Sequence, residues 1–110
     1  MSDPTAGEPV LYLYRLKPGA GAEYDRRHAE VWPELLDDIR RAGIRDYSIY
    51  RHGEIVVCRL TADHGFTVAN GRLMAGDVQR RWTASLAGLF ESTADVNGEP
   101  LWLTEVFRLD

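Results

Sequence analysis

The sequence has a single cysteine, Cys58, among its 110 residues, and it has no long apolar run. One cysteine cannot form an internal disulfide, which favours a reducing compartment, so we expect a cytoplasmic protein. A membrane-spanning helix needs about 20 successive apolar residues, so we expect no membrane association. Residues 1–4 do not begin the basic and then apolar pattern of a secretion signal.

The sequence also lacks an excess of positive charge, because 13 Lys and Arg residues stand against 17 Asp and Glu residues. A nucleic-acid-binding protein would show a basic stripe, so we expect no nucleic-acid partner. His52 and His64 have no cysteine or histidine at metal-ligand spacing. The glycines at 19 and 21 are not followed by the rest of a nucleotide-binding fingerprint. We therefore expect no metal and no cofactor.

What the chain does have is enough apolar material for one domain, with 45% hydrophobic and 10% aromatic residues. A chain of this length buries about two thirds of the surface that its unfolded form exposes. Residues 1–8 are polar and are expected to form a flexible N-terminal tail. Residues 9–110 are expected to form a single α+β domain.

Hydrophobic spacing predicts the order β-α-β-β-α-β along this domain. Strands are expected at residues 10–16, 46–51, 54–61 and 101–109. A helix is expected at 22–42, with a kink or two abutting helical segments near Trp32 and Pro33. Another helix should run from Asp77, as N-cap, to 90. Residues 63–76 should hold a short or broken helix. This order is typical of the ferredoxin-like fold, a four-stranded antiparallel sheet with helices on one face.

The first strand carries large side chains on both of its faces. Leu11 and Leu13 alternate with Tyr12 and Tyr14, and helices cover only one of the two faces in this fold. The other apolar face needs a cover as well. A second copy of the same sheet supplies one, which predicts a homodimer with a barrel-like interior.

One histidine stands out as a candidate for proton transfer. His28 lies four residues after Tyr24 and four before Trp32, so the three side chains share one side of a helix. That side should face the sheet. Imidazole is the side chain suited to passing a proton at neutral pH. The alternative is a core histidine that is hydrogen-bonded to a backbone carbonyl.

The tyrosines and tryptophans of this small domain are a second signal. Most of them should pack in the core, but a buried phenol or indole needs a partner for its polar tip. A cavity lined by such rings suits a small ligand that is both polar and apolar, such as a sugar. The candidates for this lining are Tyr24, Trp32, Tyr47, Tyr50, Trp82 and Trp102.

Several segments together resemble the L-rhamnose mutarotase family. They are EYDRRH at 23–28, VWPEL at 31–35, YSIY at 47–50, DVQRRW at 77–82 and EVF at 105–107. The similarity extends from residue 10 to residue 109. The resemblance implies a dimeric α+β barrel and a cofactor-free isomerase that interconverts the α and β anomers of a 6-deoxy sugar.

The resemblance also implies roles for individual residues. His28 matches the proton donor, Tyr24 and Tyr47 match substrate-binding residues, and Trp82 matches one of two consecutive tryptophans. Arg81 departs from this pattern, because it places a charged donor where the family has an aromatic ring. We count it among the substrate-binding candidates, and the choice between rhamnose and a relative such as fucose stays open.

Ring opening needs an acid for the ring oxygen and a base for the anomeric hydroxyl. We assign the acid to His28, and the base is either Glu105 or a bound water. Two other functions fit a similar fold. One is a dimeric αβ-barrel monooxygenase in which His28 binds haem or faces an aromatic substrate. The other is a non-catalytic small-molecule-binding or assembly module.

Overall fold

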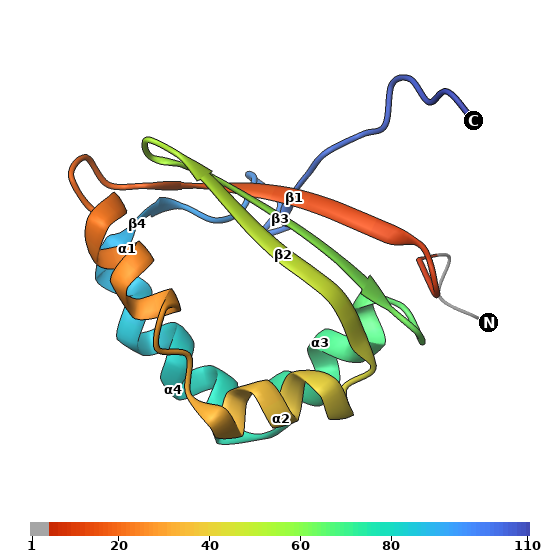
Figure 1. Ribbon diagram of the computed structural model, residues 1–110, viewed down its shortest axis with the longest axis horizontal. Coiled ribbons are helices and arrows are strands. Elements are labelled where there is room, and N and C mark those ends of the chain that lie inside the picture. The colour runs from red at the N-terminus through yellow and green to blue at the C-terminus, as the bar shows by residue number, and fades with distance from the viewer. Residues whose placement is uncertain (1–4) are drawn as a thin grey trace.

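Antiparallel pairing joins all of the strands into one sheet in the order β2-β3-β1-β4, with β5 also beside β1. The computed structural model describes residues 5–110 (Figure 1). The strands are β1 (Pro9–Leu16), β2 (Ile44–His52), β3 (Ile55–Ala62), β4 (Phe90–Ser92) and β5 (Leu101–Trp102). The strands predicted at 46–51 and 54–61 are confirmed as β2 and β3, and they pair as a hairpin with its turn at Gly53.

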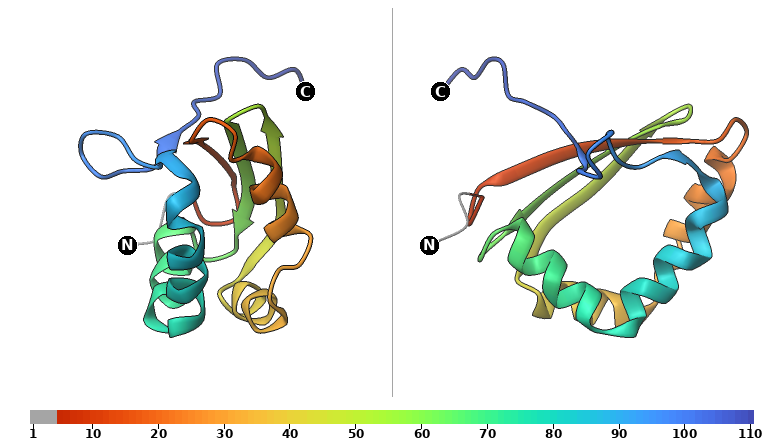
Figure 2. Two further views of the ribbon diagram at one scale, coloured as in Figure 1. Left: turned by 90° about the vertical axis from the view of Figure 1, so that its left-hand side faces the viewer. Right: turned by 180° about the vertical axis from the view of Figure 1, so that it is seen from behind.

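The helices form two bent arms on one face of this sheet (Figures 1 and 2). The first arm consists of α1 (Gly21–His28) and α2 (Pro33–Arg41), and the second of α3 (Phe66–Ala75) and α4 (Asp77–Leu86). A 3₁₀ turn, Ala87–Leu89, follows α4. The α+β, ferredoxin-like prediction is confirmed. Within residues 5–110, no helix has both the length and the apolar character to cross a bilayer.

The bend of the first arm lies where the sequence predicts it. Trp32 is extended, with φ −60° and ψ 131°, and Pro33 is the first residue of α2. Proline is tolerated there because the first turn of a helix has no internal acceptor for its N–H groups. The kink thus separates two helices, and residues 29–32 join them.

The second arm differs from the prediction in two ways. Residues Phe66–Ala75 form one helix of 10 residues despite Asn70 and Gly71, so of the expected short or broken helix the break is absent. Asp77 is the first residue of α4 rather than its N-cap, which is Gly76 in extended conformation. The Asp77 carboxylate still lies at the positive end of the helix dipole, where it is favourable.

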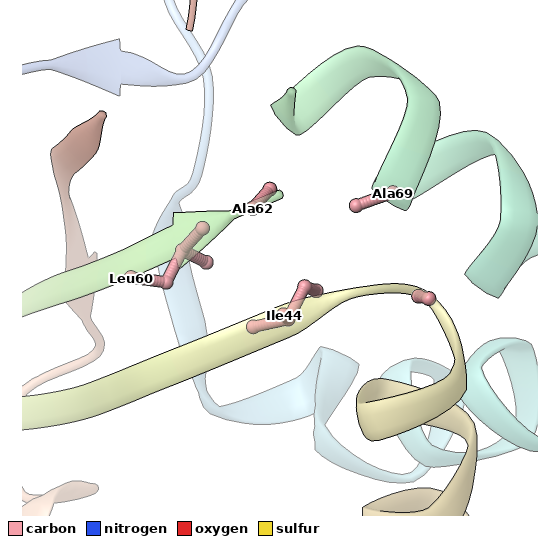
Figure 3. Close-up of a cluster of buried hydrophobic side chains, with 5 residues drawn as sticks. Ile44, Leu60, Ala62 and Ala69 are labelled. Atoms are coloured by element: carbon pink, nitrogen blue, oxygen red, sulfur yellow. The ribbon is translucent and has the colours of Figure 1, made fainter. Parts of the chain in front are cut away.

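The core lies between β3 and the helical arms. Alternate side chains of β3 are almost fully buried, from Val56 and Cys58 to Leu60 and Ala62. Figure 3 shows Leu60 and Ala62 beside Ile44 of β2 and Ala69 of α3. The small side chain of Ala69 allows α3 to approach the sheet closely at this end.

The C-terminal strand is much shorter than the predicted 101–109. Only Leu101 and Trp102 pair with β1, and the N–H of Leu103 donates to the carbonyl of Leu11. The chain then leaves the sheet, and Val106 and Phe107 are 92% and 78% exposed. Within residues 5–110, the apolar alternation of this segment has no partner surface beyond Trp102, which is why the strand prediction is wrong here.

Part of the predicted N-terminal tail contacts the domain. Residues 1–4 lie outside the described residues. The N–H of Gly7 donates to the carbonyl of Ala62, and the hydroxyl of Thr5 accepts the N–H of Phe66 at the start of α3. Thr5 therefore satisfies one of the backbone donors that the beginning of a helix leaves free.

Candidate active site

A β-bulge in β2 turns Tyr47 toward the helices. The register with β3 shifts between Arg45 and Ser48, so that two residues face one on the partner strand. Asp46 occupies the extra position with φ +53°. Without the bulge, alternation from the buried Ile44 would turn Tyr47 to the other face of the sheet.

This bulge leads to a prediction about Asp46. A β-branched side chain is strained at positive φ, so Asp46→Val should lower the free energy of unfolding by about 1–2 kcal/mol. Asp46→Asn should change it much less, because asparagine tolerates this conformation. Urea denaturation of the two variants measures the difference. Equal stability of the two variants would contradict a left-handed residue at this position.

A cavity of about 460 Å³ lies between the helical face of the sheet and the arms, and it adjoins a second of about 550 Å³. Both volumes suit a small ligand. Side chains from the sheet and from both arms border the two cavities together: Tyr12, His28, Tyr47, Ile49, Phe66, Gln79 and Trp82. Apolar residues of α2 and α3, such as Leu35 and Leu73, complete the first cavity.

The orientation of His28 is set by its own helix. Its Nδ1 lies 2.9 Å from the carbonyl oxygen of Tyr24. A carbonyl can only accept, so Nδ1 carries a proton and donates it. The backbone bond therefore leaves Nε2 as the nitrogen that can exchange a proton with a ligand. His28 is carbonyl-bonded, as the core alternative supposes, yet its side chain borders the cavity.

Two aromatic rings hold the imidazole in place. The ring of Tyr24 stacks on that of His28 with 4.1 Å between centroids, and Trp82 meets it edge-on at 5.5 Å. Tyr24 is only 2% exposed, and its hydroxyl lies 3.3 Å from that of Tyr14. Burial raises the pKa of Tyr24. Tyr24 thus lies behind His28 and does not border either of the two cavities.

Trp82 and Arg81 are neighbours in sequence, but their side chains point in different directions. Trp82 is buried against Trp32, with 5.1 Å between ring centroids, and it borders the cavity. Arg81 does not border it; its Nε lies 3.2 Å from a carboxylate oxygen of Asp77, and its guanidinium carbon lies 5.9 Å from the centre of the Trp32 ring. The structure brings together His28, Tyr47 and Trp82 and leaves Arg81 outside.

Glu105, one of the two expected bases, also lies outside the two cavities that His28 borders. It lies in the exposed C-terminal segment, where its carboxylate accepts from Nε of Arg108 at 2.6 Å. This hydrogen bond lowers the pKa of Glu105. Since Glu105 borders neither cavity of its own chain, water is the remaining one of the two expected bases.

The sequence reasoning did not identify Tyr12 or Gln79 as cavity residues. Tyr12 lies on the same face of β1 as Tyr14, and the hydroxyl of Tyr12 is 3.4 Å from that of Tyr47. Nε2 of Gln79 donates to the hydroxyl of Thr83 on the next turn of α4. The period of two in β1 could have revealed Tyr12, whereas nothing in the pattern of α4 distinguishes Gln79 from an exposed residue.

Residues 5–110 contain no group of three or more His, Cys, Asp or Glu side chains that could hold a metal ion. Cys58 is buried and unpaired on β3, where its Sγ donates to the hydroxyl of Tyr14 at 3.3 Å. Burial raises the pKa of the Cys58 thiol. This environment suits a packing residue better than a nucleophile.

Comparison with known proteins gives one family. The profile of the L-rhamnose mutarotase family matches residues 10–109. A protein named L-rhamnose mutarotase from Burkholderia orbicola is 38% identical over 94% of this chain and 99% of its own. A protein of the same name from Verminephrobacter eiseniae is 40% identical over 86% of this chain and 87% of its own length. The crystal structure of an L-rhamnose mutarotase from Formosa agariphila superposes with a TM-score of 0.69 at 21% sequence identity. The superposition covers 94% of this chain and 99% of the other.

Proposed function

The chain belongs to the L-rhamnose mutarotase family, and we propose that it interconverts the α and β anomers of L-rhamnose, with His28 as the proton-transfer residue. The observation that carries this proposal is the placement of the His28 imidazole at a ring-lined cavity, with Nδ1 bound to a carbonyl and Nε2 left for a ligand. As an anomer-exchanging enzyme, the protein is an isomerase.

The reaction needs one proton to enter and one to leave. In the charged state, His28 gives the Nε2 proton to the ring oxygen while the bond between that oxygen and C1 breaks. Water takes the proton of the anomeric hydroxyl, and an aldehyde forms at C1. Rotation about C1–C2 followed by closure on the other face returns both protons, so His28 and the water are regenerated.

Three surfaces fit the parts of this sugar. Trp82 offers a ring to the C–H face, and Tyr47 offers a hydroxyl to the polar edge. The apolar wall from Leu35 to Leu73 suits the methyl group of a 6-deoxy sugar. Arg81 can contact the sugar only if its side chain leaves Asp77 and turns toward the cavity. We therefore expect Arg81→Ala to change the rate of anomer exchange little.

The proposal is tested by saturation-transfer NMR on the anomeric protons of L-rhamnose at equilibrium. We expect the protein to transfer saturation between the α and β signals much faster than buffer alone does. D-Glucose, which has a hydroxymethyl group in place of the methyl group, is the control and should exchange more slowly. An L-rhamnose exchange rate equal to that of buffer would rule out the activity.

We also propose that the protein is a homodimer whose two sheets face each other. The sheet face opposite the helices carries apolar side chains that residues 5–110 leave only half-buried, including Leu11, Leu13 and Val57. Tyr50 on the same face is 61% exposed. The exposed C-terminal segment that contains Phe107 begins at this sheet (Figure 1).

Light scattering with size exclusion tests the dimer. One chain has a mass of 12.4 kDa, and we expect about twice that value for the particle in solution. Leu13→Lys should shift the mass toward one chain, because it places a charge in the interface. Val68→Lys on the exposed side of α3 is the matched control and should leave the dimer intact. A wild-type mass of one chain at micromolar concentration would contradict the proposal.

For the place of action we propose the cytoplasm. The support is that Cys58, the one cysteine, is a free and buried thiol, which is typical of proteins in a reducing compartment. Cell fractionation with an antibody against the protein would test this.

A further inference from the structure

Two phenolic hydroxyls meet at the cavity from different strands. The hydroxyl of Tyr12 on β1 lies 3.4 Å from that of Tyr47 on β2, and β3 separates the two strands in the sheet. Both tyrosines border the two adjoining cavities together with His28. The pair therefore forms a polar spot on a cavity wall that is otherwise largely apolar.

The pair retains hydrogen-bonding capacity for a ligand. Two phenols have two donor protons, and their mutual bond uses one of them. The thiol of Cys58 lies within hydrogen-bonding reach of Tyr12 and Tyr47, and it is a weak acceptor for the second proton. The thiol's own proton is donated to Tyr14. A sugar hydroxyl is a stronger acceptor than a thiol, so it can take the second proton and donate to a phenol oxygen in return.

The Tyr12 ring is held firmly enough to position its hydroxyl. Its centroid lies 5.7 Å from that of Trp102 and 5.9 Å from that of Phe66, both in edge-to-face geometry. Neighbouring aromatic rings restrict the rotamer before a ligand arrives, and this lowers the entropic cost of binding. Tyr14, the next tyrosine on this face, differs because its hydroxyl already bonds Tyr24 and Cys58.

We propose that Tyr12 is a further sugar-binding residue and that the hydroxyls of Tyr12 and Tyr47 together hold two adjacent hydroxyl groups of the substrate. Adjacent hydroxyl oxygens of a pyranose are about one hydrogen-bond length apart, so they match a pair of phenol oxygens in contact. This inference rests on the proposed mutarotase function, and it adds the residue that selects a vicinal diol.

Both phenols keep their protons at the pH of the reaction. Removal from bulk water raises the pKa of Tyr12, and it raises the pKa of Tyr47 to about 12. Although Tyr47 is 37% exposed, it borders the cavities, where the neighbouring groups disfavour a negative charge. The pair thus acts as neutral donors and acceptors and not as a phenolate base.

Tyr12→Phe tests this role, because it removes the hydroxyl and keeps the ring that packs on Trp102. We expect KM for L-rhamnose to rise about 3- to 10-fold, the usual effect of losing one hydrogen bond, with kcat changed less than 2-fold. Tyr50→Phe, the same change on the opposite face of the sheet, should leave both constants unchanged.

Monodeoxy sugars distinguish binding from a structural effect. Wild-type protein should bind one of the 2-, 3- and 4-deoxy analogues of L-rhamnose more weakly than L-rhamnose itself, and Tyr12→Phe should remove that difference. An unchanged KM in Tyr12→Phe, or an equal loss for L-rhamnose and for every analogue, would overturn the role of Tyr12. Failure of the proposed function is distinct, since wild-type protein would then not accelerate L-rhamnose exchange at all.

Discussion

His28→Gln is expected to slow L-rhamnose anomer exchange by about 100-fold or more, because a positioned proton-transfer group contributes about 10²–10⁴-fold. Glutamine keeps polar atoms near the carbonyl of Tyr24 but cannot take up and release a proton at neutral pH. The loss should appear in kcat rather than in KM, since Tyr47 and Trp82 still border the cavity. Saturation-transfer NMR at several L-rhamnose concentrations separates the two constants.

The other two histidines provide matched controls. His52 and His64 are exposed and do not border the cavity, so His52→Gln and His64→Gln should retain wild-type rates. Urea denaturation of His28→Gln shows whether the fold is intact, because a loss of activity in a folded protein is the relevant result. A folded His28→Gln variant with a kcat within 3-fold of wild type would remove His28 from the mechanism.

The free energy of unfolding is expected to fall steeply above pH 10. Burial raises the pKa of Tyr12, Tyr14 and Tyr24, and that of Tyr47 reaches about 12. In the unfolded chain these phenols ionise near pH 10, whereas in the folded protein they stay protonated. The folded state then binds more protons than the unfolded state, so stability decreases as pH rises through this range.

Tyr24 alone gives a lower limit for this loss of unfolding free energy. It is 2% exposed, and one phenol that ionises only in the unfolded state costs about 1.4 kcal/mol per pH unit. Tyr12 and Tyr14 stay protonated in the folded protein as well, so each of them adds to the loss of stability. Urea denaturation at pH 8, 10 and 11 measures the decline, which Tyr14→Phe should make shallower. Constant stability up to pH 11 would show that these hydroxyls are in contact with bulk water.

The helical stripe and the order of elements follow from the sequence because both depend on local patterns. Spacings of three and four residues place Tyr24, His28 and Leu35 on one side of the first arm, and Pro33 marks its bend. Buried Tyr24 and Leu35 and the cavity position of His28 confirm that side. The periodicity thus identified the arm that carries the central residue of the candidate site.

The sheet side of the cavity depends on long-range strand pairing, which no local sequence pattern encodes. Tyr47 faces inward only because the register shifts at Asp46, and one residue more or less would reverse it. Tyr12 meets Tyr47 across an intervening strand, so their contact requires the strand order of the whole sheet. The strand predicted at 101–109 is wrong for a related reason. An apolar alternating segment forms a strand only where a neighbouring strand is free to pair with it.

The most direct test of a sugar seated against His28 is NMR of the histidine rings during titration with L-rhamnose. The imidazole ¹⁵N and ¹³C signals of His28 should shift as the sugar binds, with Nε2 affected more than the carbonyl-bonded Nδ1. The signals of His52 and His64 should stay in place. Saturable binding of L-rhamnose that leaves the His28 signals unmoved would contradict the assignment of the proton-transfer role to this imidazole.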